Sequence, residues 1–265
     1  MKPLHPSTHL LLSLAATMAL LPCAVAQQAA GGAETPTVAE QYLLSAANQE
    51  RAARNLPLLH RDAQLARAAA QHAQAMAAHG SISHQFAGEP ALARRAAGMG
   101  VAFSLISENV AEAPSAVQIH EMWMNSEGHR ANLLDPAIDA AGIRVIARNG
   151  ELYAVEDFAK TVPSVSLDEQ EFAIRALIAQ LGQIALANTP DAVSAARQTC
   201  AMTTGSTGAH KPTFVMRFTS DSLTQLPDEL KTRLASGRYH QAAVGACAGN
   251  STPFTSYNIA VLLYP

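Results

Sequence analysis

Residues 143–158 read IRVIARNGELYAVEDF, and this stretch decides the fold class. In residues 143–148, three apolar side chains (Ile143, Val145 and Ala147) alternate with Arg144, Ile146 and Arg148, and a period of two is typical of a strand with two different faces. Asn149-Gly150 comes next, and Leu152–Phe158 forms a second run of strand-forming residues. Asn-Gly between two such runs is a strong signal for a two-residue hairpin. The stretch therefore predicts an antiparallel pair of strands.

Helical patterns precede this hairpin. Thr37 with Glu40 three residues later predicts a capping box at the start of one helix. A second helix is expected over residues 62–80, with an Asp cap at its start and a Gly at its end. A short helix over residues 91–97 follows, and Ser115 opens another. The first part of the chain is therefore expected to combine helices with a small antiparallel sheet.

Pro163 marks a plausible boundary, and residues 166–265 are expected to form a second, smaller α+β domain. Ser166 and Glu169 form another capping box, and an apolar stripe that includes Phe172 follows. Asp191 is expected to cap a further helix. No internal sequence repeat relates the two halves. The other expected elements are strands over residues 214–218, 239–247 and 257–264 and a helix over residues 227–234.

The first 26 residues read as a signal peptide. Lys2 gives a short positive start, Leu10–Leu21 is apolar but too short to span a bilayer, and Ala24-Val25-Ala26 is a small-residue cleavage site. Residues 27–36 then form a mobile lead-in. These features predict a secreted or periplasmic protein with no stable membrane insertion after cleavage. The net charge of −3 and the pI of about 6.4 argue against a nucleic-acid partner.

Export also decides the cysteine chemistry. The chain has 3 cysteines, and Cys23 leaves with the signal peptide. Cys200 and Cys247 remain, and two thiols in an oxidising compartment are expected to form one disulfide.

Six short motifs occur in the order found in one known family. They are ANQER at 47–51 with LPL at 56–58, LARAA at 65–69, SHQF at 83–86, SENV at 107–110, WMNSEGHRANLL at 123–134 and the strand at 153–158. In this order they resemble the bacterial branch of the CAP superfamily, also called SCP-like, which includes cysteine-rich secretory, antigen-five and pathogenesis-related proteins. The resemblance covers residues 38–161 and implies an α-β-α sandwich over residues 37–161.

The resemblance also implies a cleft floored by histidines and acids, which holds a divalent metal in some members. His84 matches the first cleft histidine of the family and Glu108 the first cleft acid. Two positions depart from the pattern of animal and plant members. Ser126 stands where they carry a second acid, and residues 137–139 stand where they carry a Gly-His-Tyr-Thr motif. His129 belongs to the bacterial Gly-His-Arg motif, which is a different position.

The chemistry of these residue types leaves alternatives open. His84 and Glu108 can share Zn²⁺, the carboxylate can orient the imidazole as a base, or the two can form a buried polar pair that ties a loop to the fold. His129 lines the same cleft or caps a helix. Ser126 lies at the cleft or serves as an N-cap. A metal site would use His84 and His129, with zinc or another divalent ion.

Two functions of different classes fit these residues. The first is a secreted, non-catalytic binding module whose cleft takes a small apolar or cell-envelope-derived ligand. The alternative is a metal-assisted hydrolase that acts on peptide or cell-wall material. A catalytic zinc usually needs three protein ligands and an open water position, and the sequence offers fewer, so no catalytic residue is assigned.

Overall fold

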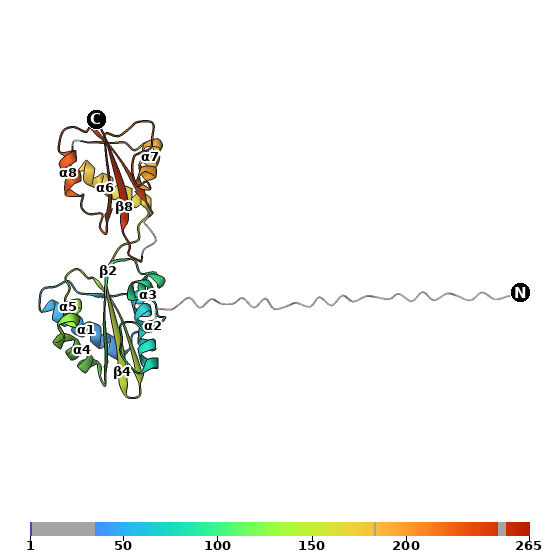
Figure 1. The fold of residues 1–265 in the computed structure, drawn as a ribbon, viewed down its shortest axis with the longest axis vertical. Helices are drawn as coiled ribbons and strands as arrows, with labels where there is room; N and C mark the ends of the chain where they lie inside the picture. Colours follow the sequence, from blue (N-terminus) through green and yellow to red (C-terminus); the bar gives the residue numbers. More distant parts are fainter. Residues whose placement is uncertain (2–34, 183, 249–252) are drawn as a thin grey trace. The chain divides into compact units, whose positions relative to one another are not determined.

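The computed structural model describes Met1 and residues 35–182, 184–248 and 253–265. In these residues the elements form two four-stranded sheets with helices packed on them, which confirms the predicted α+β class (Figure 1). Apart from Met1, the predicted signal peptide lies outside the described residues, as does most of the lead-in. None of the helices in these ranges combines the length and apolar character that a membrane crossing requires.

The first sheet has the strand order β1-β3-β4-β2. The predicted hairpin joins β3 to β4, with Arg148 paired to Glu151 and with positive φ at Asn149 (55°) and Gly150 (87°). β1 pairs in parallel with β3 through two residues, and the other pairings are antiparallel. The strands are β1 (His60–Arg61), β2 (Phe103–Ala113), β3 (Ala140–Arg148) and β4 (Glu151–Thr161).

Helices cover both faces of this sheet, which makes the expected sandwich. α2 and α3 pack on one face, and α1, α4 and α5 pack on the other (Figure 1). The predicted caps at Thr37 and Asp62 are confirmed, and α2 ends at left-handed Gly80. The helices are α1 (Val38–Ala52), α2 (Ala63–His79), α3 (Leu92–Gly98), α4 (Ala116–Asn125) and α5 (Glu127–Leu133).

α2 lies so close to the sheet that Gly142 of β3 has no room for a side chain. A Cβ built there would lie 2.2 Å from the carbonyl carbon of Leu65 and 2.3 Å from the amide nitrogen of Ala66. Both partners are backbone atoms, so a side-chain rotation would not relieve the clash. The small residue is therefore a condition for the packing of α2 on the sheet.

A buried carboxylate fastens α1 to the same strand. Because β1 pairs with only two residues of β3, the amide of Val145 further along this edge lacks a strand partner. Glu40 of the capping box is 2% exposed, and its Oε1 accepts that amide at 3.1 Å. One glutamate therefore caps α1 and satisfies the edge of the sheet.

The second sheet repeats this topology. Its strand order is β5-β7-β8-β6, with a two-residue parallel edge strand and two antiparallel pairings, as in the first sheet. α7 packs on one face, and α6 and α8 pack on the other. The elements are α6 (Leu167–Ala179), β5 (Ala185–Leu186), α7 (Pro190–Cys200), β6 (Phe214–Ser220), α8 (Asp228–Leu234), β7 (Gln241–Cys247) and β8 (Tyr257–Tyr264).

The strand register shows which residue of the second sheet corresponds to each residue of the first. The first parallel pair is His60 with Ala140 in one sheet and Ala185 with Gln241 in the other, so Ala140 corresponds to Gln241. Five residues further along each strand, the amide of Ala246 donates to the buried Oε1 of Glu171 at 3.0 Å, just as Val145 donates to Glu40. The fold therefore repeats where the sequence shows no repeat.

Two predictions for the second sheet need correction, and one is confirmed. Phe172 is 71% exposed, because the buried face of α6 is formed by Ile174 and Ile178. Thr189, with Pro190 after it, caps α7 in place of Asp191. The Cys200–Cys247 disulfide is confirmed, with Cα atoms 5.8 Å apart.

We expect Gly142→Ala to lower the free energy of unfolding by about 3 kcal/mol or more, because the added methyl must push α2 away from the sheet. Urea unfolding of the full chain measures this. Gly128→Ala is the matched control, since nothing lies within 4 Å of the new methyl on α5. The control is expected to be neutral or slightly stabilising. Equal losses in the two variants would contradict the packing argument.

Each core cluster draws its residues from one sheet and its own helices. We therefore predict that residues 35–162 fold without the rest of the chain. The isolated fragment should melt cooperatively when followed by circular dichroism. A fragment that binds an apolar dye strongly and shows no melting transition would mean that the second region completes its core.

Candidate functional site

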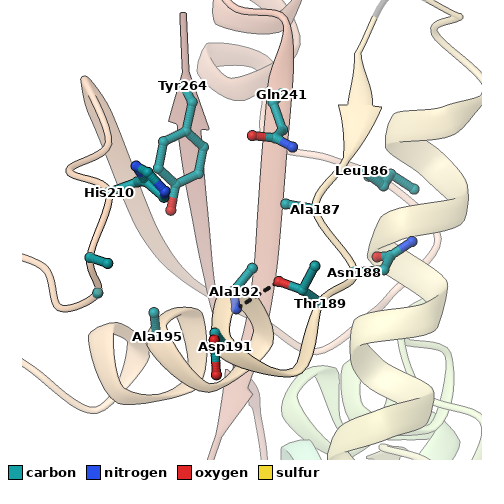
Figure 2. Close-up of a pocket in the computed structure, with 12 residues that line it drawn as sticks. Leu186, Ala187, Asn188, Thr189, Asp191, Ala192, Ala195, His210, Gln241 and Tyr264 are labelled. Carbon is teal, nitrogen blue, oxygen red and sulfur yellow. Dashed lines mark hydrogen bonds between the residues drawn. The ribbon is translucent and has the colours of Figure 1, made fainter.

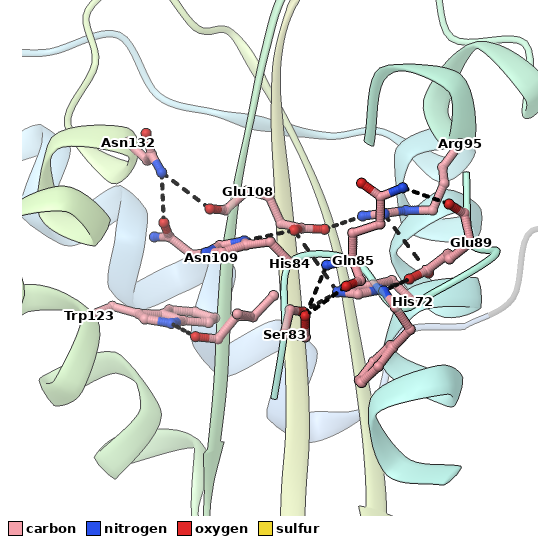
Figure 3. A network of polar contacts seen from close by, with 12 residues as sticks. His72, Ser83, His84, Gln85, Glu89, Arg95, Glu108, Asn109, Trp123 and Asn132 are labelled. Atoms are coloured by element: carbon pink, nitrogen blue, oxygen red, sulfur yellow. Dashed lines mark hydrogen bonds and ion pairs between the residues drawn. The ribbon is translucent and has the colours of Figure 1, made fainter. Parts of the chain in front are cut away.

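His84 and Glu108 meet at the surface of the first sheet, as the sequence predicts. His84 Nδ1 lies 2.9 Å from Glu108 Oε1, although 24 positions separate the two residues in the chain (Figure 3). The carboxylate side chain is 3% exposed and the imidazole is 63% exposed. Because the carboxylate accepts a hydrogen from Nδ1, the neutral ring presents Nε2 as an acceptor on its far side.

Arg95 of α3 compensates the buried charge of Glu108. Its Nη2 forms an ion pair with Glu108 Oε2, and the Arg95 side chain is fully buried (Figure 3). A buried carboxylate without such a partner would be costly. α3 therefore supplies the positive charge that lets β2 carry an acid at this depth.

His72 of α2 completes the inner wall of this group. Its Nδ1 lies 2.7 Å from Glu89 Oε1 and its Nε2 lies 2.6 Å from the carbonyl oxygen of Ser83. Both ring nitrogens are therefore engaged, and the ring is fully buried between its two partners. Its hydrogen bonds hold the 83–89 segment, which carries His84, against α2.

Asp157 is a second buried acid at the same place. It is the cross-strand partner of Glu108 on β4 and is fully buried. Burial, followed by the negative charge of Glu108, raises the pKa of the Asp157 carboxyl well above its ordinary value. No N–H or O–H group of the described residues reaches its oxygens. These surroundings therefore favour the protonated, neutral form of Asp157 beside Glu108.

The second sheet shows that the fold does not need these acids. The register positions of Glu108 and Asp157 are filled there by Val215 and Leu262, which pair in the same way. A sheet of the same topology thus forms with apolar side chains at both positions. The two acids are therefore candidates for a functional role in the first sheet.

Glu156 is a third buried acid, on the opposite face of β4. Side chains alternate along a strand, so Glu156 lies between Ala154 and Phe158 on the face covered by α1, α4 and α5. Burial raises the pKa of Glu156 to about 8. Val261 occupies the corresponding position of the second sheet.

His129 lies close enough to His84 to be affected by its charge. Burial, and then the charge of His84, lower the pKa of the half-buried His129. Its backbone carbonyl accepts a hydrogen bond from Asn109 at 3.0 Å. Ser126 is the N-cap residue of α5, as expected, but its side chain makes no capping hydrogen bond. Only its backbone takes part in the cap.

Several motif residues build the fold around this group. Asn132 donates to the Glu108 carbonyl at 3.2 Å and to the Asn109 side chain at 3.0 Å. Trp123 is fully buried and donates to the Val110 carbonyl at 3.2 Å. Arg51 is also fully buried and donates to backbone carbonyls of the segment after α1 and the segment around the end of α5.

The donors present do not fit a catalytic zinc centre. His84 Nε2 and His129 are two candidate ligands, whereas Glu108 is already bonded to His84 and Arg95. In the part of the chain that the structure describes, no three His, Cys, Asp or Glu side chains are grouped as metal ligands. A catalytic zinc usually takes three protein ligands.

Sequence reasoning missed Arg95, Glu89 and Asp157. Arg95 and Glu89 lie outside the quoted motifs, and Asp157 lies within an apolar strand pattern. A signal was present for Asp157, because an acid in a strand buried on both faces is rarely placed there without a partner.

Comparisons with known proteins agree with the motifs. The model of the cysteine-rich secretory protein (CAP) family matches residues 44–158. No curated protein matches the chain. Similar solved structures include an extracellular protein with an SCP domain from Bacillus anthracis, which is 31% identical with a TM-score of 0.44 over 46% of this chain and 40% of that chain.

Two other bacterial structures are similar over the same share of this chain, 46%. One is an outer surface protein of Borrelia burgdorferi, 22% identical over 92% of its length, with a TM-score of 0.44. The other is a cysteine-rich secretory protein of Staphylococcus aureus, 23% identical over 39% of its length, with a TM-score of 0.39. The chain thus spans 40% and 39% of the Bacillus and Staphylococcus chains.

We expect Glu108→Gln to lower the free energy of unfolding at pH 7 by about 3 kcal/mol, because buried Arg95 loses its close counter-charge and keeps only the longer ion pair with Glu89 at 3.8 Å. Asp157→Asn should change it by less than about 1 kcal/mol, since a neutral amide replaces a carboxyl whose raised pKa favours its neutral form. Urea unfolding measures both. Equal losses would show that Asp157 is ionised in the folded protein.

The raised pKa of Glu156 predicts a pH dependence of stability. From about pH 4.5 to pH 8 the unfolded chain loses this proton while the folded chain keeps it. The free energy of unfolding should therefore fall as pH rises through this window, by an amount on the order of a few kcal/mol, and then level off. Glu156→Gln should make that fall smaller. Exposed Glu127→Gln, the control, should leave the profile unchanged, and a wild-type profile retained by Glu156→Gln would refute the assignment.

Proposed function

Residues 44–158 are a CAP domain, and on that basis we propose that the protein is an exported, non-catalytic binding protein. Its ligand is small and apolar or derived from the cell envelope, and it binds on the surface around His84. Export to the periplasm or the exterior follows from the signal peptide predicted over residues 1–26.

The single observation that carries this proposal is the arrangement of His84 on Glu108. An exposed imidazole is held by a buried carboxylate whose charge Arg95 already balances. Such a ring is fixed in orientation and offers one free nitrogen to a hydroxyl or amide of a ligand. Among the described residues, no serine or cysteine side chain is hydrogen-bonded to the other ring nitrogen, Nε2, where a nucleophile would be activated. Binding is therefore the role that these contacts support best.

A depression of about 630 Å³ supports the apolar part of the proposal. Exposed Ile82, two residues before His84, and exposed Met122 of α4 contribute to its lining. Glu112, Glu121 and Glu151 also line it. The apolar side chains can receive a hydrocarbon portion, while the three acids disfavour an anionic ligand.

The second candidate is a metal-assisted hydrolase. The free Nε2 of His84 and the neighbouring His129 favour it, because the neutral imidazole is a common metal ligand. In this version His84 and His129 hold zinc or another divalent ion, and the bound metal would supply Lewis-acid chemistry. The missing third ligand makes weak metal binding and no peptide hydrolysis the expected result.

We predict that His84→Ala weakens binding of the proposed ligand class about tenfold, because one positioned hydrogen bond is lost. The probes are a fluorescent long-chain alcohol, which is apolar and uncharged, and soluble peptidoglycan fragments, titrated into the full chain. His60→Ala, which alters an exposed histidine on β1, is the control and should bind as the wild type does.

Metal-dependent activity separates the two candidates. The titration is repeated with added Zn²⁺ and with a chelator, and release of peptide products is followed. Turnover that requires Zn²⁺ and is abolished by His84→Ala would overturn the binding proposal in favour of the hydrolase. Failure of both probe classes to bind at millimolar concentration would also overturn it.

A further inference from the structure

A cavity of about 470 Å³ lies in the second sheet region and is lined by none of the residues of the candidate site (Figure 2). It opens where β5 ends, α7 begins and the segment before β6 passes. Gln241 at the start of β7 and Tyr264 at the end of β8 form one wall. These two residues are cross-strand partners on the face that α7 covers.

The first sheet explains why this cavity exists. The register positions of Gln241 and Tyr264 correspond there to Ala140 and Ala159, which pair with each other in the same way. Both alanines are fully buried and share a core cluster with Ala96 of α3. The segment that joins α7 to β6 contains no helix, whereas α3 follows α2 in the first sheet, and the cavity lies beside this helix-free segment.

The residues at these positions fit an open cavity. Under a covering helix, alanine permits close packing, whereas a buried glutamine would need hydrogen-bond partners. In the second sheet Gln241 is exposed and Tyr264 is half-buried. The change from two alanines to a glutamine and a tyrosine therefore accompanies the absence of a helix between α7 and β6.

The wall opposite the sheet is held in place before any ligand arrives. Thr207 Oγ1 donates to the Ala195 carbonyl at 3.1 Å, and the Thr207 amide donates to Thr199 at 3.1 Å. Gly208 has a φ of 112°, and a Cβ there would lie 2.9 Å from the Cβ of Ala195. These contacts fix the 205–210 segment against α7, so the cavity is largely preformed.

The lining side chains favour a neutral, hydroxyl-rich ligand. Gln241 offers a carboxamide that both donates and accepts, and the Tyr264 hydroxyl and His210 ring add further polar groups. Asp191 is the one charged residue of the lining, which includes neither lysine nor arginine. An anion would therefore meet a carboxylate without a balancing cation.

We infer that this cavity is a binding site for a saccharide, which presents hydroxyl groups to the Gln241 carboxamide and a face of C–H groups to the ring of Tyr264. The apolar floor contributed by Ala187 and Ala192 suits the less polar face of a sugar ring. The site shares no residue with the surface around His84 and takes a different class of ligand from the apolar one proposed there.

The test titrates glucose, N-acetylglucosamine and cellobiose into the full chain and follows binding by ligand-observed NMR. At least one sugar should bind, and Gln241→Ala should weaken that binding about tenfold, because a two-way hydrogen-bonding group is lost. Gln241 is exposed, so this variant should fold normally, which its melting temperature checks. Tyr264→Leu should weaken binding by a similar factor.

Two control variants test whether the sugar binds in this cavity. Gln198→Ala on the exposed side of α7 should leave sugar binding unchanged, and so should His84→Ala. If none of the sugars binds at millimolar concentration, or if inorganic phosphate or spermidine binds in their place, the saccharide assignment is wrong. If His84→Ala abolishes sugar binding while Gln241→Ala does not, the sugar occupies the surface around His84 and the cavity proposal is overturned.

Discussion

In each sheet a two-residue edge strand leaves an amide of the neighbouring strand without a backbone partner, and a buried glutamate accepts it. Glu40 of α1 does this for β3, and Glu171 of α6 does it for β7. An unpaired buried N–H group would cost about 1–3 kcal/mol, so the first helix of each unit is fixed at one place along the sheet. On the other face, Gly142 and Gly245 admit α2 and α7 to backbone contact. Together these contacts set the spacing of the three layers. That spacing determines where the loops, and therefore their side chains, lie.

The same scaffold carries different chemistry in its two copies. Where the first sheet holds Glu108, Asp157 and Glu156, the second holds Val215, Leu262 and Val261. Buried acids lower stability unless they are paired or protonated, and the second sheet shows that the topology forms without them. The first copy therefore retains three costly groups and uses Arg95 to balance one of them. This cost is expected where a protein positions a functional group, and here the exposed group that is positioned is His84.

Local signals made much of the fold predictable. The Asn149-Gly150 turn and the caps at Thr37, Asp62 and Ser166 depend on neighbours a few residues away, and all are present as predicted. β2 was not predicted, because the polar run Ser107-Glu108-Asn109 hides its strand pattern. The motif order brought His84 and Glu108 together correctly. Arg95 and Asp157 depend on pairings between distant elements, which no local pattern records, and the repeated topology left no sequence repeat to detect.

The presence or absence of one helix distinguishes what the two copies can do. α3 supplies Arg95, which allows an acid beneath His84, and its Ala96 belongs to the core cluster that contains Ala140 and Ala159. A unit with this helix can therefore hold a buried carboxylate. A unit without a helix such as α3 lacks the arginine that α3 supplies. The negative charge of an acid at the position of Val215 would then have no positive partner. The second unit has an open space beside Gln241 and Tyr264. The first unit therefore carries a histidine on a balanced buried acid and the second an open cavity, and the chain has both features because it has both units.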